Sequence, residues 1–181
     1  MYTSEILIEV RKDIDYWIEN FVEESNEFYD YKFPPCPYAR SARLKNESTV
    51  HVYDGSSSVR QFIKDKVNWL INHDQYFVHL MVFPTRVAYY PGIHRFIKNL
   101  NKEIIPQDYF GLGGFAPGTT CKYPGLLNNK NYFVIGTNKL SKVLPAVEVL
   151  KSKGYYKDWS NKHYKSIVTT REQMHEQFRN K

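Results

Sequence analysis

Cysteine is scarce in this chain: only Cys36 and Cys121 occur among 181 residues. Small disulfide scaffolds usually carry more cysteines than this. A cysteine-based zinc site needs paired spacings such as C-x-x-C, and none occurs here. No two of the six histidines follow H-x-x-x-H or H-E-x-x-H spacing. The sequence therefore excludes a disulfide scaffold and these zinc motifs, and it identifies no metal site and no cofactor.

Long hydrophobic runs are also absent. The longest mostly apolar run, Phe77 to Phe83, is far too short to span a bilayer. The first residues carry acids every few positions, which is unlike the basic and then apolar start of a signal peptide. We therefore expect a soluble, cytoplasmic protein with reduced thiols and no membrane partner.

Repeats, low-complexity tracts and Gly/Ser linkers are missing as well, so the sequence predicts a single domain over residues 1–181. Apolar residues make up 42% of the chain, which is near the globular average and enough to close a core. Aromatic residues reach 16%, and they can fill a core or form a surface that grips flat ligands. Within the domain we expect an N-terminal helix, a core and a C-terminal basic and aromatic strap, over residues 4–24, 49–154 and 155–181.

Apolar periodicity predicts helices and strands in a clear order. Residues 4–24 carry one apolar stripe at helical spacing. A capping box at Thr169 or Thr170 predicts the start of a last short helix. Between these two helices we expect strands near residues 49–53, 76–83, 109–115 and 132–137, and helices near residues 59–71, 91–104 and 140–153.

The order after the N-terminal helix is thus β-α-β-α-β-β-α. Strand-helix-strand units imply parallel pairing, and two consecutive late strands suggest an antiparallel pair at one edge. We therefore predict an α+β (mixed α/β) fold: a single layered domain with a mixed sheet of about four strands covered by helices. The same order is compatible with a thioredoxin-like layout.

The segment PPCPYARSARL, Pro34 to Leu44, is the main candidate site. A proline directly after Cys36 fits the first turn of a helix, where free N–H groups and the helix dipole stabilise a thiolate, the nucleophilic form. Arg40 and Arg43 would add positive potential, and Tyr38 would shape a pocket. The alternative is that Cys36 is a small buried hydrophobe in a rigid Pro-Pro-Cys-Pro corner.

The stretch CPYARSARL also looks like the active-site start of the glutaredoxins, where Cys-Pro-Tyr-Cys opens a helix. This resemblance implies that Cys36 is the attacking cysteine. Because Ala39 stands where the second thiol would be, it implies monothiol chemistry.

A broader resemblance covers residues 14–104. It is carried by Trp17, by CPYARSAR, by HLMVFP at residues 79–84 and by a helix ending near Ile104. The order of these segments along the chain is similar to that in the bacterial domain-of-unknown-function family 1415. That likeness implies a shared fold and no known activity.

A glycine-rich loop, Gly111 to Gly125, is a second candidate site. Glycines let a backbone approach a ligand closely, and backbone N–H groups can cradle phosphate. The loop is not a P-loop, because a threonine stands where the phosphate-gripping lysine is needed. We expect either a plain connection or a ligand-binding loop that acts through Gly113, Gly114, Gly118 and Thr119.

Charge is unevenly spread along the chain. Residues 1–30 hold nine acids and two bases, whereas residues 120–181 hold twelve bases and four acids. The C-terminal third also interleaves lysines with aromatic residues. This pattern is typical of single-strand nucleic-acid binders, because lysine attracts phosphate and aromatic faces stack bases. The alternatives are a strap whose aromatics dock on the core and pairing of the acidic and basic ends. The candidate nucleic-acid contacts are Tyr155, Tyr156, Lys157, Trp159, Lys162 and Tyr164.

These features leave three functions open. The first is a small thiol-dependent enzyme or redox protein that uses Cys36 on a small-molecule or thiol substrate, with His51 as a candidate base. The second is a module that binds nucleic acid or another polyanion through the C-terminal third. The third is an assembly protein that forms homo-oligomers through its oppositely charged ends. We favour the first, because a proline-flanked thiol at a helix start is the most specific feature.

Overall fold

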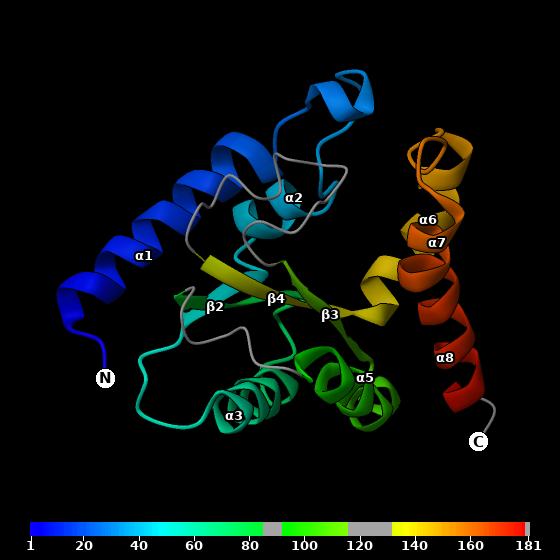
Figure 1. Cartoon of the computed structure of the whole chain (residues 1–181). Coiled ribbons are helices and arrows are strands. Elements are labelled where there is room, and N and C mark those ends of the chain that lie inside the picture. The colour runs from blue at the N-terminus through cyan, green and yellow to red at the C-terminus, as the bar shows by residue number, and fades with distance from the viewer. Residues whose placement is uncertain (85–91, 116–131, 180–181) are drawn as a thin grey trace.

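The computed structural model describes residues 1–84, 92–115 and 132–179 (Figure 1). Its strands are β1 (Ser48–Val52), β2 (Val78–Pro84), β3 (Tyr109–Phe115) and β4 (Tyr132–Lys139). Its α-helices are α1 (Ser4–Trp17), α2 (Ala39–Leu44), α3 (Val59–Ile71), α5 (Ile93–Ile104), α6 (Leu140–Ser152), α7 (Asn161–Tyr164) and α8 (Thr170–Arg179). Shorter helical turns are η1 (Ile18–Val22), η2 (Glu27–Tyr29), η3 (Ile105–Gln107) and η5 (Lys165–Thr169).

The four strands form one mixed sheet in the order β1-β2-β4-β3. Strands β1 and β2 are parallel, and β4 is antiparallel to both of its neighbours. The register of β3 shifts between Leu112 and Phe115, in the glycine-rich part of the strand, as a β-bulge does. The predicted α+β fold, the strand order along the chain and the antiparallel edge pair are confirmed. The thioredoxin-like layout stays a prediction.

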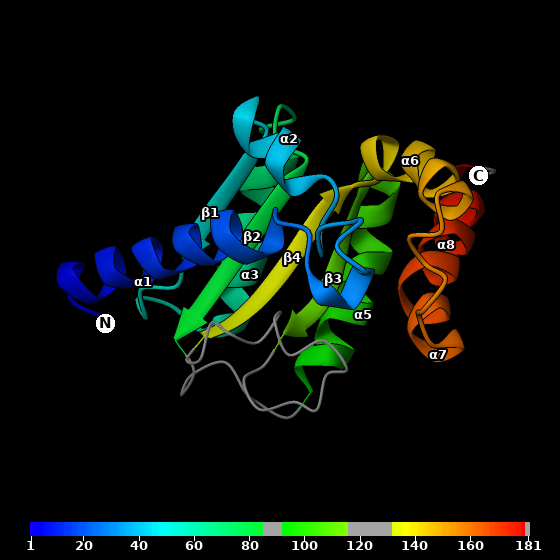
Figure 2. The same ribbon diagram turned by 90° about the horizontal axis from the view of Figure 1, so that it is seen from above.

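Helices cover both faces of the sheet (Figures 1 and 2). Because successive side chains of a strand point to opposite faces, β2 contributes to two cores. Val82 packs with α1 on one face, whereas Met81 and Phe83 pack with α3 and α5 on the other. Helices α6, α7 and α8 lie beyond the edge strand β3 (Figure 1).

The predicted N-terminal helix is confirmed. Thr3 caps α1 by accepting a hydrogen bond from the Ile6 N–H at 3.4 Å, and the apolar stripe buries Val10, Ile14 and Trp17. The helix then continues as a π-helical turn to Val22. No helix within the described residues has both the length and the apolar character needed to cross a bilayer.

The predicted last short helix is present as α8, which begins at Thr170, but it continues an earlier helical segment and no capping box opens it. Helical structure begins at Asn161, where the Ser160 hydroxyl accepts a hydrogen bond from the His163 N–H at 3.2 Å. It then passes through η5 into α8 without a break. Thr170 lies inside this helical segment, and its hydroxyl donates to the Lys165 carbonyl at 2.8 Å. Threonine inside a helix can bond an earlier carbonyl in this way, so its capping pattern did not mark a helix start.

Asn101 of α5 holds the outer backbone of the edge strand β3. Its Nδ2 donates to the Gly111 carbonyl at 2.9 Å, and its Oδ1 accepts the Gly111 N–H at 2.7 Å. A β-carbon at Gly111 would lie 3.3 Å from that Oδ1, so glycine permits this close approach. The side chain thus supplies a donor and an acceptor that a fifth strand would otherwise provide.

We expect Asn101→Ala to lower the free energy of unfolding by about 2 kcal/mol, because two buried backbone groups lose their partners. Asn99, which is exposed on the same helix, is the matched control. Its replacement by alanine should change stability by less than about 0.5 kcal/mol. Urea denaturation of both variants tests this, and equal losses would contradict the role of the Asn101 side chain.

Candidate functional site

Cys36 lies in the turn that leads from the N-terminal helical region into α2. Its own N–H donates to the Val22 carbonyl at 3.1 Å, and its carbonyl accepts the Ala39 N–H at 3.1 Å. These bonds fix the backbone on both sides of the cysteine. The side chain is half-buried and packs against the core beneath α1.

The sulfur of Cys36 is surrounded by groups with opposing effects. Burial raises the pKa of the thiol above its ordinary value, and this effect is the largest. The backbone N–H groups of Tyr38 and Ala39 donate to the sulfur, and the Arg171 guanidinium adds positive charge, all of which lower the pKa. Because desolvation prevails, the thiol is protonated at neutral pH, close to three groups that would stabilise its anion.

Arg171, at the start of α8, is the residue that the sequence analysis missed. Only 6% of it is exposed, and its Nε has no hydrogen-bond partner within the part of the chain that the structure describes. Its guanidinium carbon lies 5.5 Å from the centre of the Phe110 ring. A cation–π contact of this kind contributes about 0.5–2 kcal/mol, whereas burying a charge costs several kcal/mol.

Two tyrosines surround the guanidinium. Tyr38 and Tyr156 both interact electrostatically with Arg171, and the buried Tyr38 hydroxyl interacts with the Tyr156 side chain. Burial raises the pKa of Tyr156 to about 12 and that of Tyr38 further still. Both phenols are therefore neutral donors at physiological pH, so neither neutralises the cation.

Tyr155 joins the two segments that the sequence analysis treated as separate candidates. Its hydroxyl donates to the Pro35 carbonyl at 2.6 Å, and its ring stacks on Tyr29 with centroids 4.9 Å apart. These contacts hold the cysteine-bearing turn against the C-terminal aromatic strap. They bring Cys36, Tyr38, Tyr156 and Arg171 into one group, hereafter the Cys-Tyr-Arg cluster.

The two arginines predicted to assist Cys36 have other partners. Arg40 is 64% exposed and lies 3.7 Å from Glu24. Arg43 donates to both carboxylate oxygens of the buried Glu23, with Nη2 2.8 Å from Oε2, and it also lies 3.3 Å from Glu19. The structure therefore places Arg171, rather than Arg40 or Arg43, as the cation whose charge acts on the thiol.

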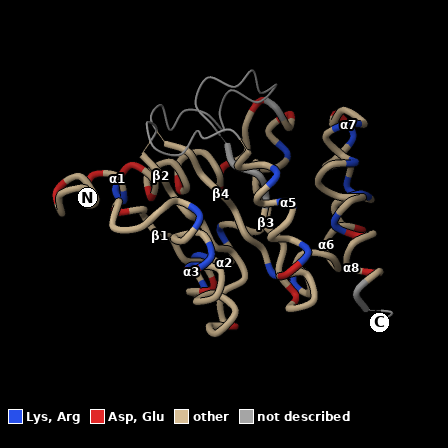
Figure 3. Tube along the Cα trace, turned by 60° about the horizontal axis from the view of Figure 1, so that its bottom comes forward, with Lys and Arg blue, Asp and Glu red and all other residues tan. Residues whose placement is uncertain are grey.

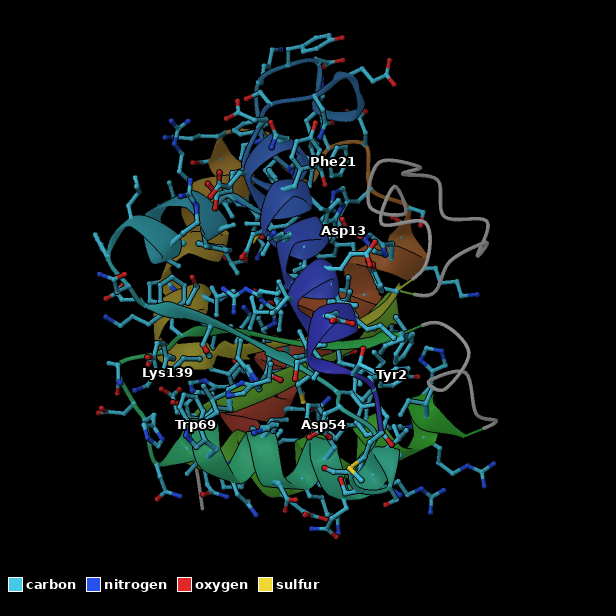
Figure 4. All side chains as sticks on the ribbon, turned by 90° about the vertical axis from the view of Figure 1, so that its left-hand side faces the viewer. Tyr2, Asp13, Phe21, Asp54, Trp69 and Lys139 are labelled. Atoms are coloured by element: carbon cyan, nitrogen blue, oxygen red, sulfur yellow. The ribbon has the colours of Figure 1, made fainter. Side chains whose placement is uncertain are left out.

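The structure does not bring His51 to Cys36. His51 lies on the sheet face that α3 covers, where its Nδ1 is 3.0 Å from Nε2 of the buried His79 and its ring meets that of Trp69 at 4.7 Å. Figure 4 shows Trp69 between α3 and the sheet, on the opposite side from Asp13 of α1 and Phe21 of η1. Cys36 packs on the α1 side, so the sheet separates the two side chains.

The histidine pair is neutral at physiological pH. Burial is the main cause that lowers the pKa of His79 to about 3 and that of His51 to about 4. One neutral ring therefore donates to the other. No cluster of three or more metal-binding side chains occurs among the described residues. We therefore interpret the two histidines as a buried polar pair with a structural role.

The candidate residues of the glycine-rich loop fall in two places. Gly113 and Gly114 belong to strand β3. Gly118 and Thr119 lie outside the described residues, as does Cys121. The structure therefore leaves the loop's predicted role in ligand binding untested.

Most of the candidate nucleic-acid contacts take part in packing within the chain. Tyr155 is only 4% exposed, and Lys157 pairs with Asp30 at 2.9 Å. The Trp159 ring packs on Tyr156 with centroids 5.0 Å apart. The remaining candidates are Lys162, which is exposed, and Tyr164, whose ring meets that of Tyr156 at 5.5 Å. Basic residues occur on several helices in Figure 3, including α3 and α5.

A cleft of about 1020 Å³ lies on another part of the C-terminal region, between α6 and α8. Its acidic lining is mostly engaged: Glu148 and Glu172 share Lys151 at 2.6 and 3.3 Å, and Asp108 accepts the Ser141 N–H at 2.8 Å. Lys151 offsets part of this acidic charge, and the lining contains no cysteine, so we place the candidate site at the Cys-Tyr-Arg cluster instead.

The fold and the site define an α+β domain with a thiol, two phenols and a buried guanidinium gathered at one edge of the sheet. The chain matches no family model, no curated protein and no solved structure. The resemblances to the glutaredoxin active-site segment and to the domain-of-unknown-function family 1415 therefore stay predictions.

Proposed function

We propose that this protein is a thiol-dependent enzyme or redox protein in which Cys36 is the reactive group. One observation carries the proposal: the sulfur receives the N–H groups of Tyr38 and Ala39 and lies within the field of the buried Arg171. Each of these groups favours the thiolate over the thiol. When Cys36 loses its proton, the anion that forms and the guanidinium neutralise each other inside the protein.

The chemistry that fits this arrangement is monothiol exchange. Ala39 occupies the position of a second thiol in a dithiol motif, so Cys36 has no resolving cysteine next to it. The Cys36 thiolate would attack a disulfide of the substrate, forming a mixed disulfide while the old S–S bond breaks. The departing thiolate takes up the proton that Cys36 has lost. Because the resting thiol is protonated, we expect this reaction to speed up as the pH rises.

Alkylation of Cys36 across pH tests the proposal. We expect the wild-type thiol to react with an apparent pKa above the ordinary value, and Arg171→Met to raise that pKa by about 1 unit, because a nearby positive charge is lost. Mass spectrometry of the labelled peptides separates Cys36 from Cys121.

Arg40→Met is the matched control, because it removes an exposed cation near the same turn and should leave the alkylation profile unchanged. The proposal fails if Cys36 stays unlabelled in the folded protein at every pH. It also fails if Arg171→Met and wild type give the same profile.

Nucleic-acid binding through the C-terminal third has less support. The rings that would stack on bases contact one another or the cysteine-bearing turn. Lys162 and Lys165 remain exposed and could attract a polyanion. A salt titration of oligonucleotide binding would detect such contacts, since they strengthen at low salt.

A further inference from the structure

Arg171 is a buried cation without a buried anion. No carboxylate lies within salt-bridge distance of its guanidinium among the described residues. Arginine stays protonated in proteins, and an isolated buried charge is unfavourable unless a partner compensates it. The neighbouring Cys36 and both tyrosines are uncharged at neutral pH. Glu172 also acts electrostatically on the guanidinium, but it is paired with Lys151 at 3.3 Å, so the positive charge of Arg171 is only partly compensated.

Two buried polar atoms belong to the group around this cation, and one of them is an unpaired donor. Arg171 Nε is buried and has no hydrogen-bond partner among the described residues, whereas the buried Tyr38 Oη interacts with the Tyr156 side chain. The Tyr156 hydroxyl belongs to the same electrostatic group. Each of these groups can donate to an oxygen, and buried donors in proteins are almost always paired. A group that supplies several acceptor oxygens and one negative charge would satisfy all of them together.

We propose that the Cys-Tyr-Arg cluster binds a small oxyanion, either free or as the anionic group of a larger ligand. A carboxylate, a sulfate and a phosphate share the required chemistry. Arg171 supplies the charge and a planar set of N–H donors suited to such oxygens. Tyr38 and Tyr156 donate through their hydroxyls and set the width of the site.

The surroundings of the cluster also suit a small ligand. Cys36, Tyr38 and Tyr156 are each half-buried, whereas the Tyr38 hydroxyl and the Arg171 side chain are buried. Phe110 covers the guanidinium from the sheet, and the Tyr155 bond to Pro35 holds the cysteine turn in place. The site is therefore built from fixed elements rather than from surface lysines.

This proposal goes beyond the reactivity of Cys36 and does not depend on it. A thiol that never reacts would still leave the cation and its unpaired Nε donor in place. The variant Cys36→Ser should therefore keep anion binding even though it abolishes thiol labelling. In the wild-type protein, anion binding without any labelling of Cys36 would overturn the proposed function alone, and labelling of Cys36 without anion binding would overturn the anion site alone.

The test is a titration of the full chain with phosphate, sulfate and acetate at constant ionic strength, followed by calorimetry and by NMR shifts. We expect saturable binding of at least one of these ions, and the ranking of the three identifies the class of anionic group. Arg171→Met should weaken that binding by at least about 10-fold, and Tyr38→Phe should weaken it by about 3- to 10-fold.

Arg40→Met is again the control, because its exposed cation should contribute nothing to affinity. Thermal unfolding without anion checks that the Arg171→Met and Tyr38→Phe variants fold. The proposal is overturned if no ion binds saturably up to about 10 mM. It is also overturned if a folded Arg171→Met protein binds as tightly as wild type.

Discussion

Arg43→Met is expected to lower the free energy of unfolding by about 3–4 kcal/mol, because it would leave a buried carboxylate without its cation. The Glu23 side chain is only 1% exposed, and Arg43 donates to both of its oxygens. The pair connects α2 to the end of the N-terminal helical segment. Chemical denaturation of the variant at neutral pH measures the loss.

Two further variants show whether the buried carboxylate is the cause. Arg40 lies one turn before Arg43 on the same helix, and its exposed pair with Glu24 at 3.7 Å should contribute less than about 0.5 kcal/mol. Combining Glu23→Gln with Arg43→Met removes the charge as well as its partner, so it should recover much of the lost stability. If Arg40→Met proves as harmful as Arg43→Met, the burial of Glu23 is not the reason.

Acid is expected to destabilise the protein through the histidine pair. His79 is fully buried, and its folded pKa of about 3 lies below the ordinary histidine value of 6.5, as does that of His51 at about 4. Below pH 6.5 the unfolded chain therefore binds more protons than the folded chain. The stabilisation is complete above this pH and is lost as the pH falls toward the folded values.

Between pH 7.5 and pH 5 we expect a loss of about 3 kcal/mol, of which about 2 kcal/mol comes from His79 and less from the partly exposed His51. Urea denaturation at the two pH values measures it. His79→Gln keeps a neutral polar side chain beside His51. It should remove the part of the pH-dependent loss of stability that comes from His79. His94→Gln, at an exposed position of α5, should leave the pH dependence unchanged. An unchanged pH dependence in His79→Gln would rule out the pair as its source.

The periodicity of the sequence was sufficient to predict the fold. The apolar side chains that recur at helical spacing in α1 and α3 form the buried faces of these helices, as predicted. The near-continuous apolar run of β2 lies at the centre of the sheet, covered on both faces. Such patterns predict structure well because burial of a stripe or a strand face is the main contribution to stability.

The candidate site could be predicted only in part. Cys36 and Tyr38 were predicted because proline and cysteine next to a helix start form a local pattern. Arg171 carries no local pattern, since an arginine in a helix is usually solvated. Its role arises because α8 packs over Phe110 of β3 and beside the cysteine turn, and the sequence shows neither contact.

The His51–His79 pair had a faint signal in the sequence. Both residues occupy inward positions of predicted strands, and parallel pairing of those strands sets Thr49 opposite His79. A single-residue change in that register would send one ring to the other face. The pair could therefore be predicted only once the register was known.

The contact between Asn101 and Gly111 also bears on how this protein behaves at high concentration. An edge strand with free amide and carbonyl groups invites a strand from a neighbouring molecule, which is a common route to aggregation. Here that row of groups is interrupted by an amide side chain from the same molecule. A second molecule could dock at this point only by displacing α5, so the helix that completes the core also keeps the sheet from growing.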